Sequence, residues 1–221
     1  MPRLARVDIG NNIYHVINRA SGRLQIFNDA SDYQLFEDLL LEAKEITDMR
    51  ILAYVVMPNH WHLVLYPRSD GDLGTFMHRL TNAHTRRVHV KTKTIGHGPL
   101  YQGRYKSFLV DTDEYFLTLM KYVERNPVRA KLTNVCEEWR WGSVQQHASS
   151  DMRILSESPI PLPEQYLKWI NTAEREEILN TIRYSVNKGA PYGRDKWVDV
   201  MVKEYNLGAT MRGGGRPRLI N

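Results

Sequence analysis

Hydrophobic positions in the first half of the chain follow two periods. Short stretches that alternate between apolar and polar residues, or are continuously apolar, are typical of strands, and longer stretches with apolar residues three and four apart are typical of helices. In chain order the pattern predicts a strand at 13–19, a helix at 29–47, strands at 49–57 and 60–67, a helix at about 72–89 and a strand at 107–110. This β-α-β-β-α-β order predicts an α+β fold of the ferredoxin-like class, an antiparallel sheet with its helices on one face.

The second half of the chain predicts further helices around an irregular segment. One helix begins near Asp113 and ends before Pro127, because the residue ahead of a proline avoids the helical conformation. Residues 137–163 carry two tryptophans and three prolines, which favours a segment that wraps around other elements. Two more helical patterns follow, at 173–189 and 195–208. The predicted parts are a first domain at 1–135, a helical C-terminal extension at 136–210 and a basic flexible tail at 211–221.

Charge and cysteine content narrow the class of protein. The chain has 221 residues, 30 of them Lys or Arg against 25 Asp or Glu, and a pI near 9.3, which favours a polyanionic partner. Cys136 is the single cysteine, which excludes an internal disulfide and a cysteine-based zinc cluster. The first residues lack the apolar stretch of a signal peptide, and no apolar run is long enough to span a membrane. We therefore predict a cytoplasmic protein without a membrane partner.

Two histidines one residue apart begin the third predicted strand, in "MPNHWHLVLYP". On a strand, His60 and His62 share one face, while Trp61, Leu63 and Leu65 share the other and supply the core. The histidines are therefore not needed for packing. Neutral imidazoles bind divalent transition ions and can share Mg²⁺ or Mn²⁺ with oxygen ligands. The pair is either two unrelated surface histidines or half of a metal site with open positions for a substrate.

The helix near 113–126 carries a candidate nucleophile. Tyr115 lies in its first turn at the edge of the apolar stripe. A phenol can form a covalent intermediate when nearby positive charge lowers its pKa, and the same tyrosine can equally close the core. Lys121, Arg125 and Arg129 on this segment are either phosphate contacts or a solvated face.

Four motifs, in their order and spacing, resemble those of the single-tyrosine HUH transposases, and in particular the REP-associated tyrosine transposases of bacteria. They are "YHVINR", "MPNHWHLVLYP", "GPLYQGRYKS" and "DEYFLTLMKYVERNPVRA". The likeness runs from about Ile13 to Trp141, and the ending "GAPYG…W…LG…GGGRPR" resembles the C-terminal extension of that subgroup. The resemblance implies the same ferredoxin-like sheet, a catalytic domain at 1–135, and a nucleoid-associated bacterial protein.

The resemblance also implies a reaction on single-stranded DNA and on hairpins formed by palindromic repeats. His60 and His62 would hold a divalent metal ion, Mg²⁺ or Mn²⁺, which orients the scissile phosphate and neutralises charge on its oxygens. Tyr115 would attack the phosphodiester, giving a 5′-phosphotyrosine and a free 3′-hydroxyl. A hydroxyl of a second strand would later reverse the step, so that the protein is an endonuclease and strand transferase.

One departure from the family concerns the metal. Many relatives carry a third, polar metal ligand four residues after the tyrosine, one helical turn along on the same face. Counted from Tyr115, this position is Leu119, which cannot coordinate. Water and DNA complete the coordination, or Glu124 or Asn126 reaches in, or the site is weakened.

Basic residues along the chain are candidate DNA contacts, and the alternative for each is a solvated surface. The tail sequence "GRPR" also resembles an AT-hook, which enters the minor groove of A·T-rich DNA. The predicted DNA-binding residues are Arg19, Arg86, Arg87, Arg104, Lys106, Lys121, Arg125, Arg129, Arg216 and Arg218.

Other functions remain compatible with these motifs. The main alternative is a catalytically weakened regulator that binds DNA hairpins with the same fold, for which Leu119 is the motivating feature. A replication initiator or relaxase would use the same chemistry, and a metal-dependent hydrolase would act through water and leave no covalent adduct. The sequence leaves open whether the protein is a monomer or a homodimer.

Overall fold

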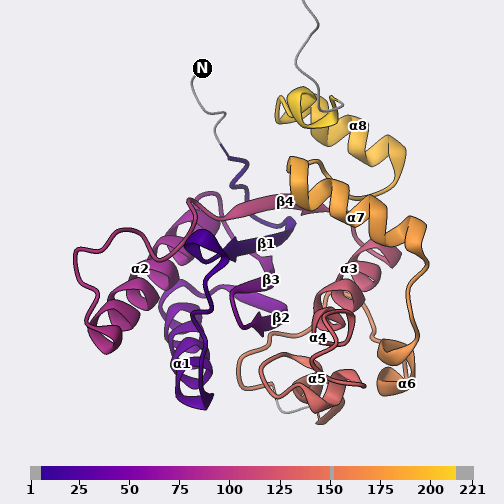
Figure 1. The fold of residues 1–221 in the computed structure, drawn as a ribbon. Coiled ribbons are helices and arrows are strands. Elements are labelled where there is room, and N and C mark those ends of the chain that lie inside the picture. The colour runs from indigo at the N-terminus through magenta and orange to yellow at the C-terminus, as the bar shows by residue number, and fades with distance from the viewer. Residues whose placement is uncertain (1–5, 150–151, 213–221) are drawn as a thin grey trace, which may run out of the picture.

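The computed structural model describes residues 6–149 and 152–212, and a four-stranded antiparallel sheet lies at its centre (Figure 1). The strand order is β2-β3-β1-β4, which is the order of a ferredoxin-like sheet. Each of the four predicted strands is present within two residues of its predicted bounds. The strands are β1 (Ile13–Arg19), β2 (Arg50–Met57), β3 (His60–Tyr66) and β4 (Lys106–Val110).

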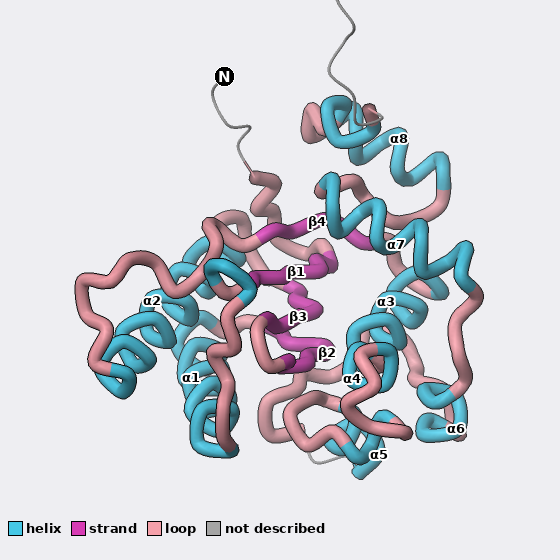
Figure 2. Tube along the Cα trace, viewed as in Figure 1, coloured by secondary structure: helices cyan, strands magenta, loops and turns pink. Residues whose placement is uncertain are grey.

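Two long helices cover one face of the sheet, as the pattern predicts (Figure 2). They are α1 (Ala30–Thr47) and α2 (Asp72–Thr92). The side chain of Asp29 accepts hydrogen bonds from the backbone N–H groups of Ser31 and Asp32, which explains where α1 begins. Trp61 and Phe36 are fully buried between these helices and the sheet. The α+β, ferredoxin-like prediction is therefore confirmed.

The opposite face of the sheet is covered by α3 (Glu114–Glu124) and the short α4 (Asn126–Arg129) (Figure 1). Alternation along β1 directs His15 and Ile17 to this face, because they pair with residues of β3 and β4 that point the same way. The apolar stripe of α3 packs against it and is buried. Leu119 belongs to this stripe and is fully buried in the core.

The C-terminal extension wraps around α3 and then passes the β4 edge of the sheet (Figure 1). Trp139 and Trp141 anchor its first part, because Nε1 of Trp139 donates to the carbonyl of Val56 and the ring of Trp141 stacks on Tyr33. The two helices predicted after residue 170 are present, whereas α5 and α6, each six residues long, were not predicted. The helices of the extension are α5 (Val144–Ser149), α6 (Tyr166–Asn171), α7 (Glu176–Lys188) and α8 (Asp195–Glu204).

The segment after α7 lies along the outer edge of β4. The N–H of Tyr192 donates to the carbonyl of Leu109, and the N–H of Asp111 donates to the carbonyl of Tyr192. The approach is so close that a Cβ at Gly193 would lie 2.4 Å from the Cβ of Asp111, so only glycine fits there. The C-terminal end of α7 is therefore held beside β4.

Of the helices that the structure describes, none combines the length and the apolar character needed to cross a membrane. Arg216, Arg218 and most of the predicted basic tail fall outside the described residues. The domain boundary near residue 135 stays a prediction.

Candidate active site

His60 and His62 lie side by side on the face of the sheet that α3 covers. Their ring centroids are 5.1 Å apart. The cross-strand partner of His60 is Arg19 and that of His62 is Ile17, both on β1. Trp61 points to the other face and is fully buried, as the alternation predicts. Both imidazoles therefore belong to the face where α3 approaches the sheet.

Each histidine ring is held at its Nδ1 atom. Nδ1 of His60 lies 2.6 Å from Oδ1 of Asn59, and Nδ1 of His62 lies 2.8 Å from Nε2 of His15. Within 6–149 and 152–212, neither Nε2 atom has a hydrogen-bond partner, and neither is among the buried polar atoms left without one. Neither Nε2 atom is thus completely enclosed, although the His62 residue as a whole is only 2% exposed. An imidazole that is hydrogen-bonded at one ring nitrogen and unpaired at the other is typical of a metal ligand.

Both histidines are neutral in this environment. Burial, together with the charge of Arg19, lowers the pKa of His60 to about 4. Burial also holds the pKa of His62 well below its ordinary value, and the neighbouring His15, His60, Arg129 and Arg19 act in the same direction. Metal ions bind the neutral imidazole, so the lowered pKa values favour a ligand role.

The tyrosine next to this pair is Tyr122. Its ring centroid lies 6.1 Å from that of His62 and 6.4 Å from that of His15, edge-on to both. Its hydroxyl has no hydrogen-bond partner in the described part of the chain and is not among the buried unpaired atoms. Burial raises the pKa of Tyr122, although the charge of Arg129 opposes this. The phenol is therefore protonated at rest, and its oxygen is not completely enclosed.

Tyr115, the nucleophile that the sequence predicts, lies elsewhere on the same helix. Its ring packs edge-on against Tyr192 of the extension, with the centroids 5.2 Å apart. Tyr115 and Tyr122 are seven residues apart, which places them on the same side of α3 but about 10 Å apart along its axis. The structure brings Tyr122, and not Tyr115, to the histidine pair.

A polar residue follows Tyr122 at the spacing that the resemblance noted in the sequence gives for a third metal ligand. Asn126 lies four residues after Tyr122, at the start of α4. Its Nδ2 donates to the carbonyls of Tyr122 and Val123, both at 3.2 Å, and its Oδ1 has no partner among the residues described. Counted from Tyr122, the position of the third ligand is thus an amide oxygen rather than Leu119. The sequence carried this signal in the Tyr-x-x-x-Asn spacing, which the prediction of Tyr115 did not use.

Glu124, the other residue considered for this role, is turned away from the histidines. Its carboxylate accepts hydrogen bonds from Ser143 and Tyr166 of the extension, and Nε2 of His147 lies 3.5 Å away. Burial raises the pKa of Glu124 to about 7. Its partners tie it to the extension, so it does not reach the metal-binding atoms.

Two arginines give the site a positive potential. The guanidinium carbon of Arg129 lies 4.3 Å from the centroid of the Tyr122 ring, and Nη2 of Arg129 donates to the backbone carbonyl of Tyr122. Nη1 of Arg129 pairs with Glu174 at 2.9 Å. Arg19 is the cross-strand partner of His60 at the end of β1, and its charge acts on His60, His62 and Tyr122. A phosphate at the histidines would therefore be near both cations, because each of them acts on His62.

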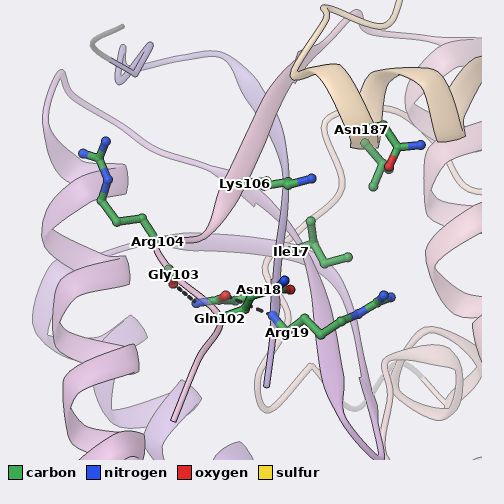
Figure 3. A pocket seen from close by; sticks show the side chains of 9 residues that line it. Ile17, Asn18, Arg19, Gln102, Gly103, Arg104, Lys106 and Asn187 are labelled. Carbon is green, nitrogen blue, oxygen red and sulfur yellow. Dashed lines mark hydrogen bonds between the residues drawn. The ribbon is translucent and has the colours of Figure 1, made fainter. Parts of the chain in front are cut away.

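The exposed residues among the other predicted DNA contacts lie on two different surfaces. Arg104 and Lys106 are exposed and line a hollow together with Arg19 (Figure 3). Arg86 and Arg87 are exposed on α2, across the sheet from the histidines. Arg216 and Arg218 cannot be placed, because they lie outside the described residues.

The remaining two predicted contacts face the extension. Arg125 is buried, its Nε lies 2.7 Å from Glu174, and its Nη1 donates to the carbonyl of Ile170. The structure argues against a phosphate contact by Arg125, because the side chain is buried and its Nε and Nη1 donate inside the protein. Lys121 lies over the ring of Trp169, 5.1 Å from its centroid, on the side of α3 that faces α6.

The nitrogen and oxygen donors near Tyr122 suit a divalent metal ion such as Mn²⁺ or Mg²⁺. In the part of the chain that the structure describes, no three His, Cys, Asp or Glu side chains gather into a metal site. The candidate donor atoms are Nε2 of His60 and Nε2 of His62, and the amide oxygen of Asn126 is a third candidate because of its spacing from Tyr122. Two imidazoles with an oxygen donor suit Mn²⁺ and can accommodate Mg²⁺, with positions left for water or a phosphate oxygen.

Two solved structures of transposases are similar to the chain. The structure of a REP-associated tyrosine transposase bound to a REP hairpin has 16% sequence identity and a TM-score of 0.58, with 73% of this chain and 95% of that chain covered. The crystal structure of a Deinococcus radiodurans protein described as a transposase has 22% identity and a TM-score of 0.40, with 57% and 97% covered. No curated protein matches the sequence. The model of the IS200-like transposases matches residues 9–126, more than half of the chain, and the chain therefore belongs to the IS200-like transposase family.

Proposed function

We propose that this transposase is a metal-dependent single-stranded-DNA endonuclease and strand transferase of the HUH type, with Tyr122 as its nucleophile. The observation that carries the proposal is the position of Tyr122, whose ring lies edge-on to His62 while its hydroxyl makes no hydrogen bond within the described residues. Tyr122 takes the role that the sequence predicted for Tyr115. The family pattern supports the change, because a polar residue, Asn126, follows Tyr122 at the ligand spacing.

The reaction follows from the site. The Tyr122 phenol loses its proton as its oxygen attacks the phosphorus of a phosphodiester, and the bond from phosphorus to the 3′-oxygen breaks. The leaving 3′-oxygen takes up a proton, and the 5′-phosphate stays on the tyrosine. A 3′-hydroxyl of another strand later attacks the same phosphorus and releases the phenol. The number of phosphoester bonds is conserved in both steps, so no nucleoside triphosphate is consumed.

His60, His62 and Asn126 are the residues that would hold Mg²⁺ or Mn²⁺. When bound, the ion would polarise a non-bridging phosphate oxygen and neutralise charge that develops on it. The Nδ1–H of His62 then donates to Nε2 of His15, which fixes the ring so that its Nε2 faces the substrate. Arg19 and Arg129 both supply positive charge to the phosphate, and Arg129 also favours the phenolate form of Tyr122.

The substrate that fits best is a DNA hairpin with single-stranded flanks, formed by a palindromic repeat in bacterial DNA. The basic balance of the chain and the basic hollow next to the histidines support a nucleic-acid partner. The structural neighbour that binds a REP hairpin has the same fold. The extension covers the outer side of α3, which favours a monomer. We expect this monomer to act in the cytoplasm near the nucleoid, where its DNA substrate is. The weakened-regulator alternative loses its motivation, because Leu119 is not the residue that follows the proposed nucleophile.

A covalent-adduct assay tests the assignment. The full chain is mixed with a labelled hairpin oligonucleotide and Mn²⁺, denatured, and examined for a labelled protein band. We expect an adduct with the wild type and with Tyr115→Phe, and none with Tyr122→Phe or with EDTA. Circular dichroism checks that both variants are folded. An adduct in Tyr122→Phe, or its loss only in Tyr115→Phe, would show that Tyr122 is not the nucleophile.

A further inference from the structure

A hollow of about 240 Å³ lies directly beside the proposed active site (Figure 3). Its walls come from the end of β1, the loop at 102–104, the start of β4 and the last turn of α7. Figure 3 shows that the side chains of Ile17, Arg19 and Lys106 extend to one side, toward Asn187 on α7, while Arg104 points away. The hollow therefore opens on the same face of the sheet as the histidines.

The strand register fixes how close this hollow is to the metal ligands. Ile17 is the cross-strand partner of His62, and Arg19 is the partner of His60. Directly opposite residues have Cβ atoms about 4.5–5.5 Å apart and share a face. A phosphodiester held at the histidines would consequently place a neighbouring nucleotide over Ile17 and Arg19, at the mouth of the hollow.

The lining of the hollow has the groups that an unpaired nucleotide requires. Ile17 offers an apolar surface for the face of a base, and Arg19 and Lys106 offer positive charge to a phosphate. The side-chain amides of Gln102 and Asn187 have no hydrogen-bond partner within the described ranges. Each amide has two N–H donors and one oxygen acceptor, which are therefore free to bind a ligand. Cations position a nucleic acid without regard to sequence, whereas amides distinguish bases by their edges.

Asn187 is held at the hollow by a fixed part of the fold. α7 ends at Gly189, which adopts φ 73° and whose N–H donates to the carbonyl of Ser185. Three residues later, Tyr192 is hydrogen-bonded to the edge of β4. The chain between them is short, so the last turn of α7 keeps its place next to Lys106.

We propose that this hollow binds one unpaired base that flanks the cleaved phosphodiester, and that Asn187 and Gln102 select it by its hydrogen-bonding edge. The inference rests on the proposed function, because the register places the base relative to the cleaved phosphate. It assigns the C-terminal extension a part in substrate choice, since Asn187 belongs to α7.

A selection experiment tests the proposal without requiring cleavage. Full-length protein carrying Tyr122→Phe is incubated with a DNA hairpin whose unpaired bases next to the stem are randomised, and bound and unbound DNA are sequenced. We expect one position with a preference of about five- to hundredfold for one base, the discrimination typical of a paired amide contact. Asn187→Ala should level this preference. Asn180→Ala, at an exposed asparagine of the same helix that does not line the hollow, should leave it unchanged.

The outcomes separate this proposal from the function on which it rests. Equal binding of all four bases, or a preference that survives Asn187→Ala, would overturn the base-selection role. Lys106→Gln should weaken all sequences alike, as expected for a phosphate contact. If the protein cleaves DNA through Tyr122 but shows no base preference, only the present inference is wrong. If the protein binds no single-stranded DNA and forms no adduct, the proposed function is wrong as well.

Discussion

The carboxylate of Glu174 is the shared counter-charge of two arginines behind the proposed nucleophile. Oε2 lies 2.7 Å from Nε of Arg125, and Oε1 lies 2.9 Å from Nη1 of Arg129. The side chain of Glu174 is 3% exposed, and those of the arginines are 8% and 17% exposed, so solvent and salt screen these pairs little. Glu174→Gln keeps the shape of the side chain and removes its charge.

The size of the effect follows from this burial. Removing one partner of a buried ion pair costs about 3–5 kcal/mol, because the other charge stays buried and uncompensated. A loss near 3 kcal/mol, the lower end of this range, is expected, because Arg125 still donates a hydrogen bond to the carbonyl of Ile170 and Arg129 still donates one to the carbonyl of Tyr122. For a chain of this length, about 3 kcal/mol corresponds to a fall in Tm of about 6–12 °C. The control is Glu176→Gln, whose pair with Arg183 is exposed and contributes about 0–1 kcal/mol.

Two measurements separate stability from catalysis. Thermal melting of both variants gives the loss of stability, and adduct formation at a temperature where both are folded gives the effect on the reaction. Because Glu174 holds Arg129 against Tyr122, we expect the adduct to form about ten- to hundredfold more slowly in Glu174→Gln. Melting curves that coincide for the two variants would refute the reasoning about the buried cluster. A destabilised Glu174→Gln that reacts at the wild-type rate would refute the positioning of Arg129.

Three further predictions concern other parts of the molecule. Burial alone would raise the pKa of Asp111, but the hydrogen bonds to its carboxylate and the charge of Arg194 outweigh burial and lower this pKa. The ionised Asp111 therefore stabilises the fold at neutral pH, and this stabilisation is lost as the pH falls. Asp111→Asn should therefore have a lower Tm than the wild type at pH 7, and the difference in Tm should shrink as the pH falls below about 4. A difference in Tm that does not change with pH would contradict the role of the ion pair. His15→Phe removes the partner of His62, and calorimetry should show Mn²⁺ affinity lowered about 10- to 100-fold, whereas unchanged affinity would contradict the role of His15. Burial raises the pKa of the Cys136 thiol to about 11, so a thiol reagent should modify the folded protein slowly and the unfolded protein fully; fast modification of the folded protein would show that the thiol is open.

The helices and strands of the sheet domain could be predicted because each follows a local sequence pattern, either a helix cap with helical spacing or alternation along a strand. The helix predicted at 29–47 is α1, and Asp29 caps it as its side chain allows. The two histidines share a face because side chains alternate along any strand, whatever surrounds it. Elements as short as α5 and α6 escape this kind of prediction, because six residues do not complete two helical turns.

Periodicity could not choose between two tyrosines on one side of α3. A spacing of seven residues returns a side chain to almost the same direction, so Tyr115 and Tyr122 are equivalent on a helical projection. What differs is the position along the axis, which depends on where α3 lies on the sheet. The one local signal was the residue four places on, which is Leu119 after the first tyrosine and Asn126 after the second. Leu119 is buried in the core, and with Tyr122 as the proposed nucleophile the residue at the ligand position is Asn126 instead.

The ion-pair partners of charged residues that face the extension could not be predicted from the helix that carries those residues. Arg125 occupies a position that a helical pattern assigns to solvent or to DNA, and its partner Glu174 lies 49 residues later in the chain. The same carboxylate holds Arg129 against Tyr122, so residues on the two sides of the predicted boundary at 135 share one charge network. A chain that ended at that boundary would leave the guanidinium groups of Arg125 and Arg129 without this counter-charge, and the hollow next to Lys106 without Asn187. The extension is therefore better understood as a wall of the proposed active site than as an appendage to a finished domain.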